Sequence, residues 1–389
     1  MMQNTSSKLV FSLIIMLQTN LLYSQIGGNE RRYISIGSLQ SYYTAYGSER
    51  AWNGSYYEGL VWPADYSHQD NAVIKRAWIA ASDFTDENGT DWDYWGTYIY
   101  NNYVENSLFP VELKQTAKFN HPAVYVDGYN TSQDLNIVDE INADQIPDRI
   151  VTNVVNTSLG LTMTRRISAF SQQYHDNYFI KEFIFTNTGN VDYDEEIELV
   201  DSLNGVRVGW GIRYSVCREG ASIVDRQQMW GKHSWVSKRG EDYPDHVNEI
   251  ITGNDTIVDW IRCGFSWFGQ SEIVSFDNIG APDIWDGGRL SAPQHAGVAI
   301  LHVDSSATNN NDDPFQPAVL GWHAGDSYPS VGNMTQSDLP GMIQLYDFLS
   351  GNPYPNATMG GTDRMWENNT TSITDPVDPY TVHGDGGGT

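Results

Sequence analysis

Apolar and polar residues alternate with a period of two through much of the segment 157–217. Alternation of this kind predicts β-strands with one buried and one exposed face, because successive side chains of a strand point to opposite faces. Four strands are therefore expected in this segment. They cover residues 159–167, 178–186, 191–199 and 206–216.

The second and third of these strands are expected to have different surroundings. Residues 178–186 are apolar on both faces, which is typical of a strand that is covered on both sides. The third strand has an acidic residue at every second position, and these residues should face water: Asp192, Asp194, Glu196 and Glu198. Between the two, Gly189 suits the positive φ of a tight hairpin turn. The four strands together predict an antiparallel meander.

Shorter alternating or apolar stretches predict further strands on either side of the meander. They lie at residues 33–43, 73–81, 94–103, 118–126, 229–238, 256–268 and 297–303. One short helix is expected near residues 338–350, where apolar residues recur at helical spacing. Ser337 or Asp338 can cap its start, Pro340 suits its first turn, and Gly351 can end it.

The fold class that follows is all-β, an antiparallel β-sandwich that in its largest form is a two-sheet supersandwich. Residues 25–150 are expected to form an N-terminal β region with acidic loops, and residues 151–383 a sandwich core packed with it. Residues 384–389 are rich in glycine and predict a flexible tail.

The first 24 residues are typical of a signal peptide. Lys8 precedes an apolar run over residues 9–17, and Ser24 is a small residue at a suitable cleavage position. The alternative is a buried first helix. No later stretch reaches the roughly 18 apolar residues of a membrane span. The sequence therefore predicts an exported protein, secreted or held at the outer cell surface, with no membrane span after cleavage.

The chain is strongly acidic, with 49 Asp and Glu residues against 22 Lys and Arg residues and a net charge of −27. This balance disfavours nucleic acids and anionic membranes as partners, because both attract basic residues. It is compatible with binding of hard cations such as Ca²⁺ through oxygen ligands.

Only two cysteines occur, Cys217 and Cys263. In an exported chain they can form one disulfide. In the chain-entropy model, closing the loop between them would stabilise the folded state by about 4 kcal/mol. Each also falls near the end of an aromatic-rich strand pattern, where buried free thiols are common. Both alternatives stay open.

Three regions are candidate cation sites. His302 and Asp304 leave a predicted strand on the same face, and Asp312 and Asp313 follow nearby, so imidazole and oxygen ligands are available there. The acidic loops 83–93 and 127–144 could hold Ca²⁺ without EF-hand spacing, the latter through residues such as Asp127 and Asp134. The alternatives are a histidine satisfied by a neighbouring carboxylate, and solvated charged turns.

Aromatic residues near the N-terminal loops are candidates for stacking on sugar rings. They are Trp52, Tyr56, Tyr57, Trp62, Trp92 and Trp95. The alternative is that these side chains pack in the core or cover turns. A glycosidase would also need two carboxylates roughly 5–10 Å apart across a cleft, and the sequence selects no such pair.

Several motifs spread along the chain carry a family resemblance. They are residues 70–78 (DNAVIKRAW) with 83–86 (DFTD), 162–167 (TMTRRI), 171–177 (SQQYHDN), 185–189 (FTNTG), and 302–304 (HVD) with 312–314 (DDP). The set resembles the N-terminal region of large secreted proteins from Bacteroidetes and related bacteria, which often end in a type IX secretion sorting domain. The resemblance covers most of residues 33–389. It implies an exported location and no particular reaction. The sequence has no such sorting domain, which predicts that the natural chain continues further.

The sequence contains no phosphate-cradling glycine-rich loop and no HExxH, CxxC or GxSxG pattern. We therefore expect a non-catalytic, exported β-sandwich module that acts in adhesion, assembly or scaffolding. The alternative is a carbohydrate-binding or glycan-processing protein. Expected partners are extracellular glycans or other surface proteins.

Overall fold

The structure is a computed structural model, and it consists mainly of β-strands in several sheets. It describes residues 26–49, 60–62, 74–99, 107–121, 125–130, 137–213, 233–236, 249–252, 255–258, 262–267, 282–283, 289–290, 295–313, 343, 346 and 349. The expected all-β fold of sandwich type is confirmed.

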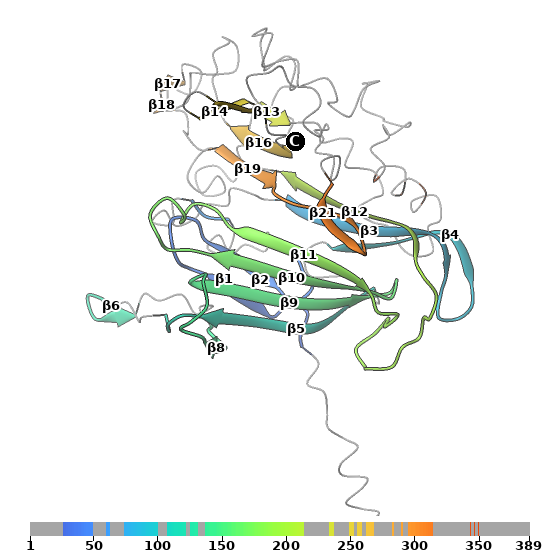
Figure 1. The fold of residues 1–389 in the computed structure, drawn as a ribbon. Helices are drawn as coiled ribbons and strands as arrows, with labels where there is room; N and C mark the ends of the chain where they lie inside the picture. The colour runs from blue at the N-terminus through green and yellow to red at the C-terminus, as the bar shows by residue number, and fades with distance from the viewer. Residues whose placement is uncertain are drawn as a thin grey trace, which may run out of the picture.

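A five-stranded sheet forms one layer of the molecule (Figure 1). Its strands, in spatial order, are β11 (Ile180–Asn187), β10 (Leu161–Ala169), β9 (Arg149–Thr157), β5 (Leu108–Ala117) and β8 (Glu140–Ile141). Neighbouring strands are antiparallel except for β5 and β8, which are parallel. Strands β9, β10 and β11 follow one another in the chain, so this part of the predicted meander is present.

A three-stranded sheet and a hairpin provide the second layer. The sheet has the order β12 (Asn204–Arg213), β3 (Ile74–Thr85) and β4 (Asp91–Ile99), and all its pairs are antiparallel. The hairpin consists of β1 (Arg31–Ile34) and β2 (Ser41–Thr44). The first predicted strand with its turn, at residues 33–43, corresponds to this hairpin.

Two apolar clusters on one face of the five-stranded sheet join these layers. The first combines β3 and β4 residues such as Ile79 and Trp95 with Val155 and Met163 of the large sheet. The second combines Ile34 and Tyr43 of the hairpin with residues such as Val151 and Ile167. Burial of these side chains supplies the main stabilisation of such a sandwich, because it removes apolar surface from water.

A buried arginine lies between the two clusters. Arg165 is 0 % exposed and stands between Met163 and Ile167 on β10. It donates hydrogen bonds to the carbonyl oxygen atoms of Gly47 (2.6 Å) and Thr44 (3.1 Å). Its guanidinium also bonds Asn153 Oδ1 at 3.2 Å and lies 3.4 Å from a Glu49 carboxylate oxygen. The side chain thereby ties the loop after β2 to the large sheet.

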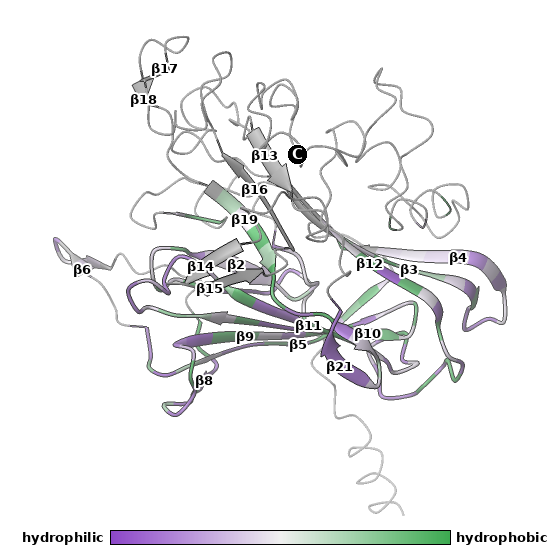
Figure 2. Cartoon of the chain, turned by 45° about the horizontal axis from the view of Figure 1, so that its top comes forward, coloured by the Kyte–Doolittle hydropathy of each residue, from purple (hydrophilic) through white to green (hydrophobic). Residues whose placement is uncertain are grey.

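Other strands form small antiparallel sheets in the described ranges. They are β6 (Tyr125–Val126) with β7 (Tyr129–Asn130); β13 (His233–Val236), β16 (Arg262–Trp267) and β19 (His295–Ile300); β14 (Glu249–Thr252) with β15 (Asp255–Val258); β17 (Pro282–Asp283) with β18 (Arg289–Leu290); and β20 (Asp304–Ser306) with β21 (Asn309–Asp312). The last of these, β21, consists of hydrophilic residues (Figure 2).

Three details of the strand prediction are wrong. Residues 191–199 form a loop, because side-chain oxygen atoms there accept hydrogen bonds from the backbone and compete with a strand ladder. Strand β12 consequently pairs with β3 and not with a neighbour in the meander. Residues 118–121 lie outside any strand, and among the described residues of the predicted strand 118–126 those that pair are Tyr125 and Val126.

The strand predicted at residues 178–186 is β11, and it is not covered on both sides. Its Phe183 and Phe185 are half-buried and face Trp210 of β12, whereas Ile180 and Ile184 are exposed. A strand is buried on both faces only where a layer covers each face, and among the described residues the contacts of β11 with β12 lie on the Phe183 side.

Three residues of the predicted helix are described, and all three are helical: Ile343, Tyr346 and Leu349. Tyr346 and Leu349 pack against β12, where glycines allow a close approach. A Cβ atom on Gly209 would lie 2.4 Å from Leu349 Cδ2, and one on Gly205 would lie 2.3 Å from the Tyr346 hydroxyl. Within the described ranges, no helix has the length and apolar character needed to cross a bilayer.

Several sequence-based predictions lie wholly or partly outside the described residues. The predicted signal peptide and the flexible tail belong to this group, and so does Cys217. Cys263 lies on β16, opposite Ala299 of β19. The disulfide therefore stays a prediction.

Candidate cation site between β11 and β12

The loop of residues 188–203 connects the five-stranded sheet to the three-stranded sheet. Its two limbs meet at Gly189, whose carbonyl accepts a hydrogen bond from the Leu199 N–H (3.0 Å), while its own N–H donates to the Gly160 carbonyl (2.9 Å). Gly189 has φ 76, and a Cβ atom there would lie 1.9 Å from the Leu199 carbonyl oxygen. Only glycine fits this closure.

Side-chain oxygen atoms shape the first limb of the loop. The N–H of Asp192 donates to Asn190 Oδ1 (3.0 Å), that of Asp194 to Asp192 Oδ1 (2.8 Å), and that of Glu196 to Asp194 Oδ1 (2.7 Å). Each bond spans two residues, which is the geometry of an Asx-turn. The three successive turns hold the Asp192 and Asp194 carboxylates in fixed positions on the inner side of the limb.

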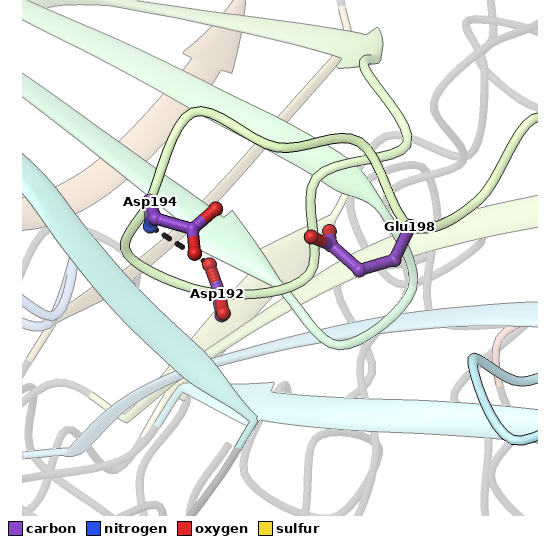
Figure 3. A group of neighbouring side chains, drawn as sticks. All are labelled: Asp192, Asp194 and Glu198. Carbon is purple, nitrogen blue, oxygen red and sulfur yellow. Dashed lines mark hydrogen bonds between the residues drawn. The ribbon is translucent and has the colours of Figure 1, made fainter.

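The second limb brings a third carboxylate to the same place. Glu198 Oε2 accepts a hydrogen bond from the Val191 N–H at 3.0 Å, so the side chain reaches across the loop. Carboxylate oxygen atoms of Asp192, Asp194 and Glu198 all lie within 4.8 Å of one another (Figure 3). Asp194 is exposed, and the other two side chains are half-buried.

Asn156 of β9 anchors this loop on the sheet. Its side-chain amide donates to Asn190 Oδ1 (3.0 Å) and to the Asp192 carbonyl (2.9 Å). Three carboxylates this close repel one another, and a cation among them would offset that repulsion. Carboxylate oxygen atoms are the ligands that Ca²⁺ prefers, at about 2.3–2.6 Å. These residues are the part of the described chain best able to hold such an ion.

The hairpin of β20 and β21 brings together three of the sequence-predicted cation ligands. His302 Nε2 lies 2.9 Å from Asp304 Oδ1, and His302 Nδ1 lies 3.8 Å from Asp312 Oδ1. Asp312 Oδ1 also accepts a hydrogen bond from the Val303 N–H, and the Asp313 N–H donates to the Val303 carbonyl. Because each ring nitrogen faces a different carboxylate, the geometry matches a histidine satisfied by its neighbours better than ligands converging on one ion.

The remaining predicted cation ligands belong to two other loops, one of which lies partly outside the described residues. Asp127 is exposed at the turn of the β6–β7 hairpin with φ 51, and Asp134 lies outside the described residues. In the 83–93 loop, the Asp86 carboxylate accepts bonds from the Asn88 and Thr90 N–H groups and from Trp92 Nε1. Desolvation acts to raise the pKa of Asp86, but these hydrogen bonds outweigh it and lower the pKa.

The described tryptophans among the predicted sugar-stacking residues mostly pack in or against the core. Trp95 is buried, contacts Phe84 with ring centroids 5.5 Å apart, and donates from Nε1 to Ser158 Oγ. Trp92 is half-buried, and its ring centroid lies 4.8 Å from that of Trp95. Trp62 is also half-buried and follows Val61, which forms an isolated β-bridge with Gln40. The other three predicted sugar-stacking residues, Trp52, Tyr56 and Tyr57, lie outside the described residues.

Sequence reasoning placed Asp192, Asp194 and Glu198 on a water-facing strand and so missed their convergence. The signal that could have shown it is the spacing Asn190, Asp192, Asp194, in which three Asx residues at alternate positions favour successive turns. Comparisons with protein-family models, curated proteins and solved structures found no match, so the site rests on its own geometry.

Proposed function

We propose that the protein is an exported, non-catalytic β-sandwich module of a bacterial secreted or cell-surface protein that acts in adhesion, assembly or scaffolding. The signal-peptide-like N-terminus and the resemblance to secreted proteins of Bacteroidetes support the location. The net charge of −27 also suits a protein that stays soluble outside the cell.

The connection between β5 and β9 carries most weight for this proposal. Its described residues include six large hydrophobic side chains that are between 44 % and 83 % exposed: Phe119, Tyr125, Tyr129, Ile137, Ile141 and Ile146. Single exposed hydrophobic residues are common, but a group of them along one connection is typical of a surface that contacts another protein. A connection at the edge of a rigid sheet is also where binding residues usually lie.

The β6–β7 hairpin presents two of these residues to the surroundings. It stands away from the sheets at one end of the molecule (Figure 1). Its turn residues Asp127 and Gly128 have φ 51 and 85, as a two-residue type I′ turn requires. Tyrosine is favoured in contact surfaces because it supplies a large area with few rotatable bonds. Tyr125 and Tyr129 therefore suit a contact role.

Site-directed photo-crosslinking in the exporting cell tests the proposal. A benzoylphenylalanine placed at Tyr129 is expected to give one discrete adduct with an extracellular protein, and excess unlabelled protein should compete it away. Tyr174 is a matched control because it is exposed to a similar degree, 80 % against 77 %, on a different loop. Equal adduct formation at both positions would contradict a contact role for the hairpin.

Activity assays address the non-catalytic part of the proposal. We expect the purified protein to hydrolyse neither glycans nor peptides. A hydrolytic activity that one Asp or Glu substitution abolishes would overturn this part, and specific binding on a glycan array would favour the carbohydrate alternative.

A further inference from the structure

A cavity of about 330 Å³ opens between the three-stranded sheet and the helical residue Tyr346. Its lining consists of Ser82 and Asp83 from β3, Asp93 and Tyr94 from β4, and Tyr346. This volume is at the small end of ligand pockets in proteins and suits a group of side-chain size better than an oligosaccharide.

The aromatic wall of this cavity is held firmly in place. The Tyr346 hydroxyl donates to the Gly205 carbonyl at 2.8 Å, and the Arg207 guanidinium donates to the Tyr346 carbonyl at 2.8 Å. The Arg207 guanidinium also lies 3.8 Å from the centre of the Tyr346 ring, and the Tyr94 ring lies 4.6 Å from it. Tyr346 is only 8 % exposed, so it leaves little open ring face for stacking on a sugar.

Two exposed aspartates, Asp83 and Asp93, line the cavity. Asp83 and Asp93 occupy the positions between the paired residues Ser82–Tyr94 and Phe84–Trp92, and so lie opposite each other across the hairpin. Both side chains are exposed, and within the described ranges neither has a hydrogen-bond or ion-pair partner. Like charges directly opposite each other destabilise a strand pair. A cationic group bound between them would remove this cost.

The backbone at Asp83 contributes to this arrangement. Asp83 has φ 49, which is uncommon outside glycine. Before it, Ala77, Ile79 and Ala81 alternate toward the core, whereas the next core residue is Phe84. The alternation between core and surface thus shifts by one residue at Asp83. Continued alternation after Ala81 would place Asp83 in the core, but its side chain is exposed and lines the cavity together with Tyr94.

We propose that this cavity binds the guanidinium group of an arginine side chain on a partner peptide or protein. A planar guanidinium presents paired N–H donors that match carboxylates, and it also packs well beside aromatic rings. The two carboxylates would accept its hydrogen bonds, and Tyr94 would flank its plane. This site is distinct from the Asp192 cluster and from the β5–β9 connection, so it does not depend on the function proposed above.

Isothermal titration with short blocked peptides tests this assignment. The probes are acetyl-Gly-Arg-Gly-amide, its citrulline counterpart, which has nearly the same shape without the charge, and its lysine counterpart. We expect the arginine peptide to bind, and its affinity to weaken with added salt, as for an exposed charge pair. The citrulline peptide should bind about tenfold more weakly or not at all, because the charge-assisted hydrogen bonds are lost.

Two variants locate the binding in the cavity. Asp83→Asn and Asp93→Asn should each weaken binding of the arginine peptide by about tenfold, since each removes one charged acceptor. Asp144→Asn is the matched control because it neutralises an exposed aspartate elsewhere and should leave the affinity unchanged. Thermal melting verifies that the variants fold.

Four outcomes would overturn the proposal. They are no binding of the arginine peptide at millimolar concentration, equal binding of the citrulline or lysine peptide, unchanged affinity in the Asp83→Asn, Asp93→Asn double variant, and binding of free argininamide in preference to the peptide. The last outcome would assign the site to a free small molecule. Crosslinking at Tyr129 is independent of all four, so failure here is separable from failure of the proposed function.

Discussion

At the level of single residues, Arg165 is expected to have a large effect on stability. Its guanidinium is buried between the two apolar clusters and bonds the carbonyls of Gly47 and Thr44. Glu49, its acidic neighbour, is also buried and is shared with Lys181. Removing one partner of a buried charge network leaves the other groups without compensation.

We expect Arg165→Met to lower the free energy of unfolding by about 3 kcal/mol or more, as for other broken buried ion pairs. Arg166→Met is a matched control in the adjacent position, since Arg166 pairs with Glu182 on the surface. An exposed pair of this kind is worth about 0–1 kcal/mol. Urea denaturation of both variants measures the difference, and equal losses would contradict a structural role for the buried network.

Asp148 is expected to contribute to the loss of stability of the folded protein at low pH. Its carboxylate accepts hydrogen bonds from the Ser171 N–H and hydroxyl, both at 2.8 Å, and lies 3.2 Å from the Lys118 ammonium. Desolvation acts to raise the pKa of Asp148, but the bonds from Ser171 and the charge of Lys118 lower it overall. A carboxyl group with a lowered pKa in the folded state stabilises the fold above its unfolded pKa of about 3.9.

That stabilisation is lost as the pH falls through the folded-state pKa of Asp148. We therefore expect Asp148→Asn to cost about 1.5–3 kcal/mol at pH 7, the range for a hydrogen bond to a charged group. The difference from the wild type should shrink below about pH 4, where the wild-type carboxyl takes up its proton. Urea denaturation at several pH values measures this, and a difference that does not change with pH would count against the Asp148 contribution.

At the level of elements, the loop between β11 and β12 depends on the closure at Gly189. Gly189→Ala meets both a positive φ and the backbone of Leu199, with 1.9 Å between the new Cβ atom and the carbonyl oxygen. Gly89→Ala separates the two effects, because Gly89 has the same φ of 76 and no atom within 4 Å of the Cβ position.

We expect Gly89→Ala to cost about 1 kcal/mol, the scale of left-handed strain for a residue with a Cβ atom. Gly189→Ala should cost clearly more, because the loop backbone must move as well. Thermal and urea denaturation of the two variants give the comparison. Equal costs would show that the two limbs of the loop are not held as tightly as the contact between Gly189 and Leu199 indicates.

The element level also shows where sequence patterns predict well and where they fail. Strands β10 and β12 have clear alternation and β11 is a mostly apolar run, and the sequence predicts all three. Strands β5 and β9 were missed, because buried polar residues such as Gln115, Arg149 and Asn153 interrupt their apolar pattern. Pro110 and the register shift after it obscure β5 further. In a sequence pattern, a polar residue that is buried in the core cannot be distinguished from a polar residue on the surface.

For the whole molecule, the loop with the three carboxylates matters because it joins the two sheets of the sandwich. A ligand that binds only the folded state stabilises it by about 2.7 kcal/mol when present at 100 times its dissociation constant. We expect Ca²⁺ to raise the melting temperature of the wild type relative to a chelator. Asp194→Asn should abolish this response, because it removes the exposed carboxylate of the cluster.

In chelator alone, Asp194→Asn should be at least as stable as the wild type, since it relieves repulsion among the three carboxylates. Asp144→Asn serves as the control for a general effect of net charge. A melting temperature that is the same in Ca²⁺ and in chelator would contradict cation binding by the loop.

The sequence predicts the class of the whole fold but not its pairing. Period-two alternation shows that a segment is a strand, and it carries no information on which distant segment is its neighbour. The pairing of β12 with β3 joins positions as distant as Arg213 and Ile74. The acidic cluster could not be located for the same reason, because Asp192 and Glu198 meet only through the path of the loop.

The pairing of β3 with β12, together with that of β5 with β9, has a consequence for how the chain can be divided. A break in the connection between β5 and β9 would leave β3 and β5 in the earlier piece. Their partners β12 and β9 would be in the later piece. Each fragment alone would expose unpaired strand edges and an uncovered apolar face. The two pieces are therefore suited to complementation, in which separately made fragments recover the native sandwich only when they are mixed.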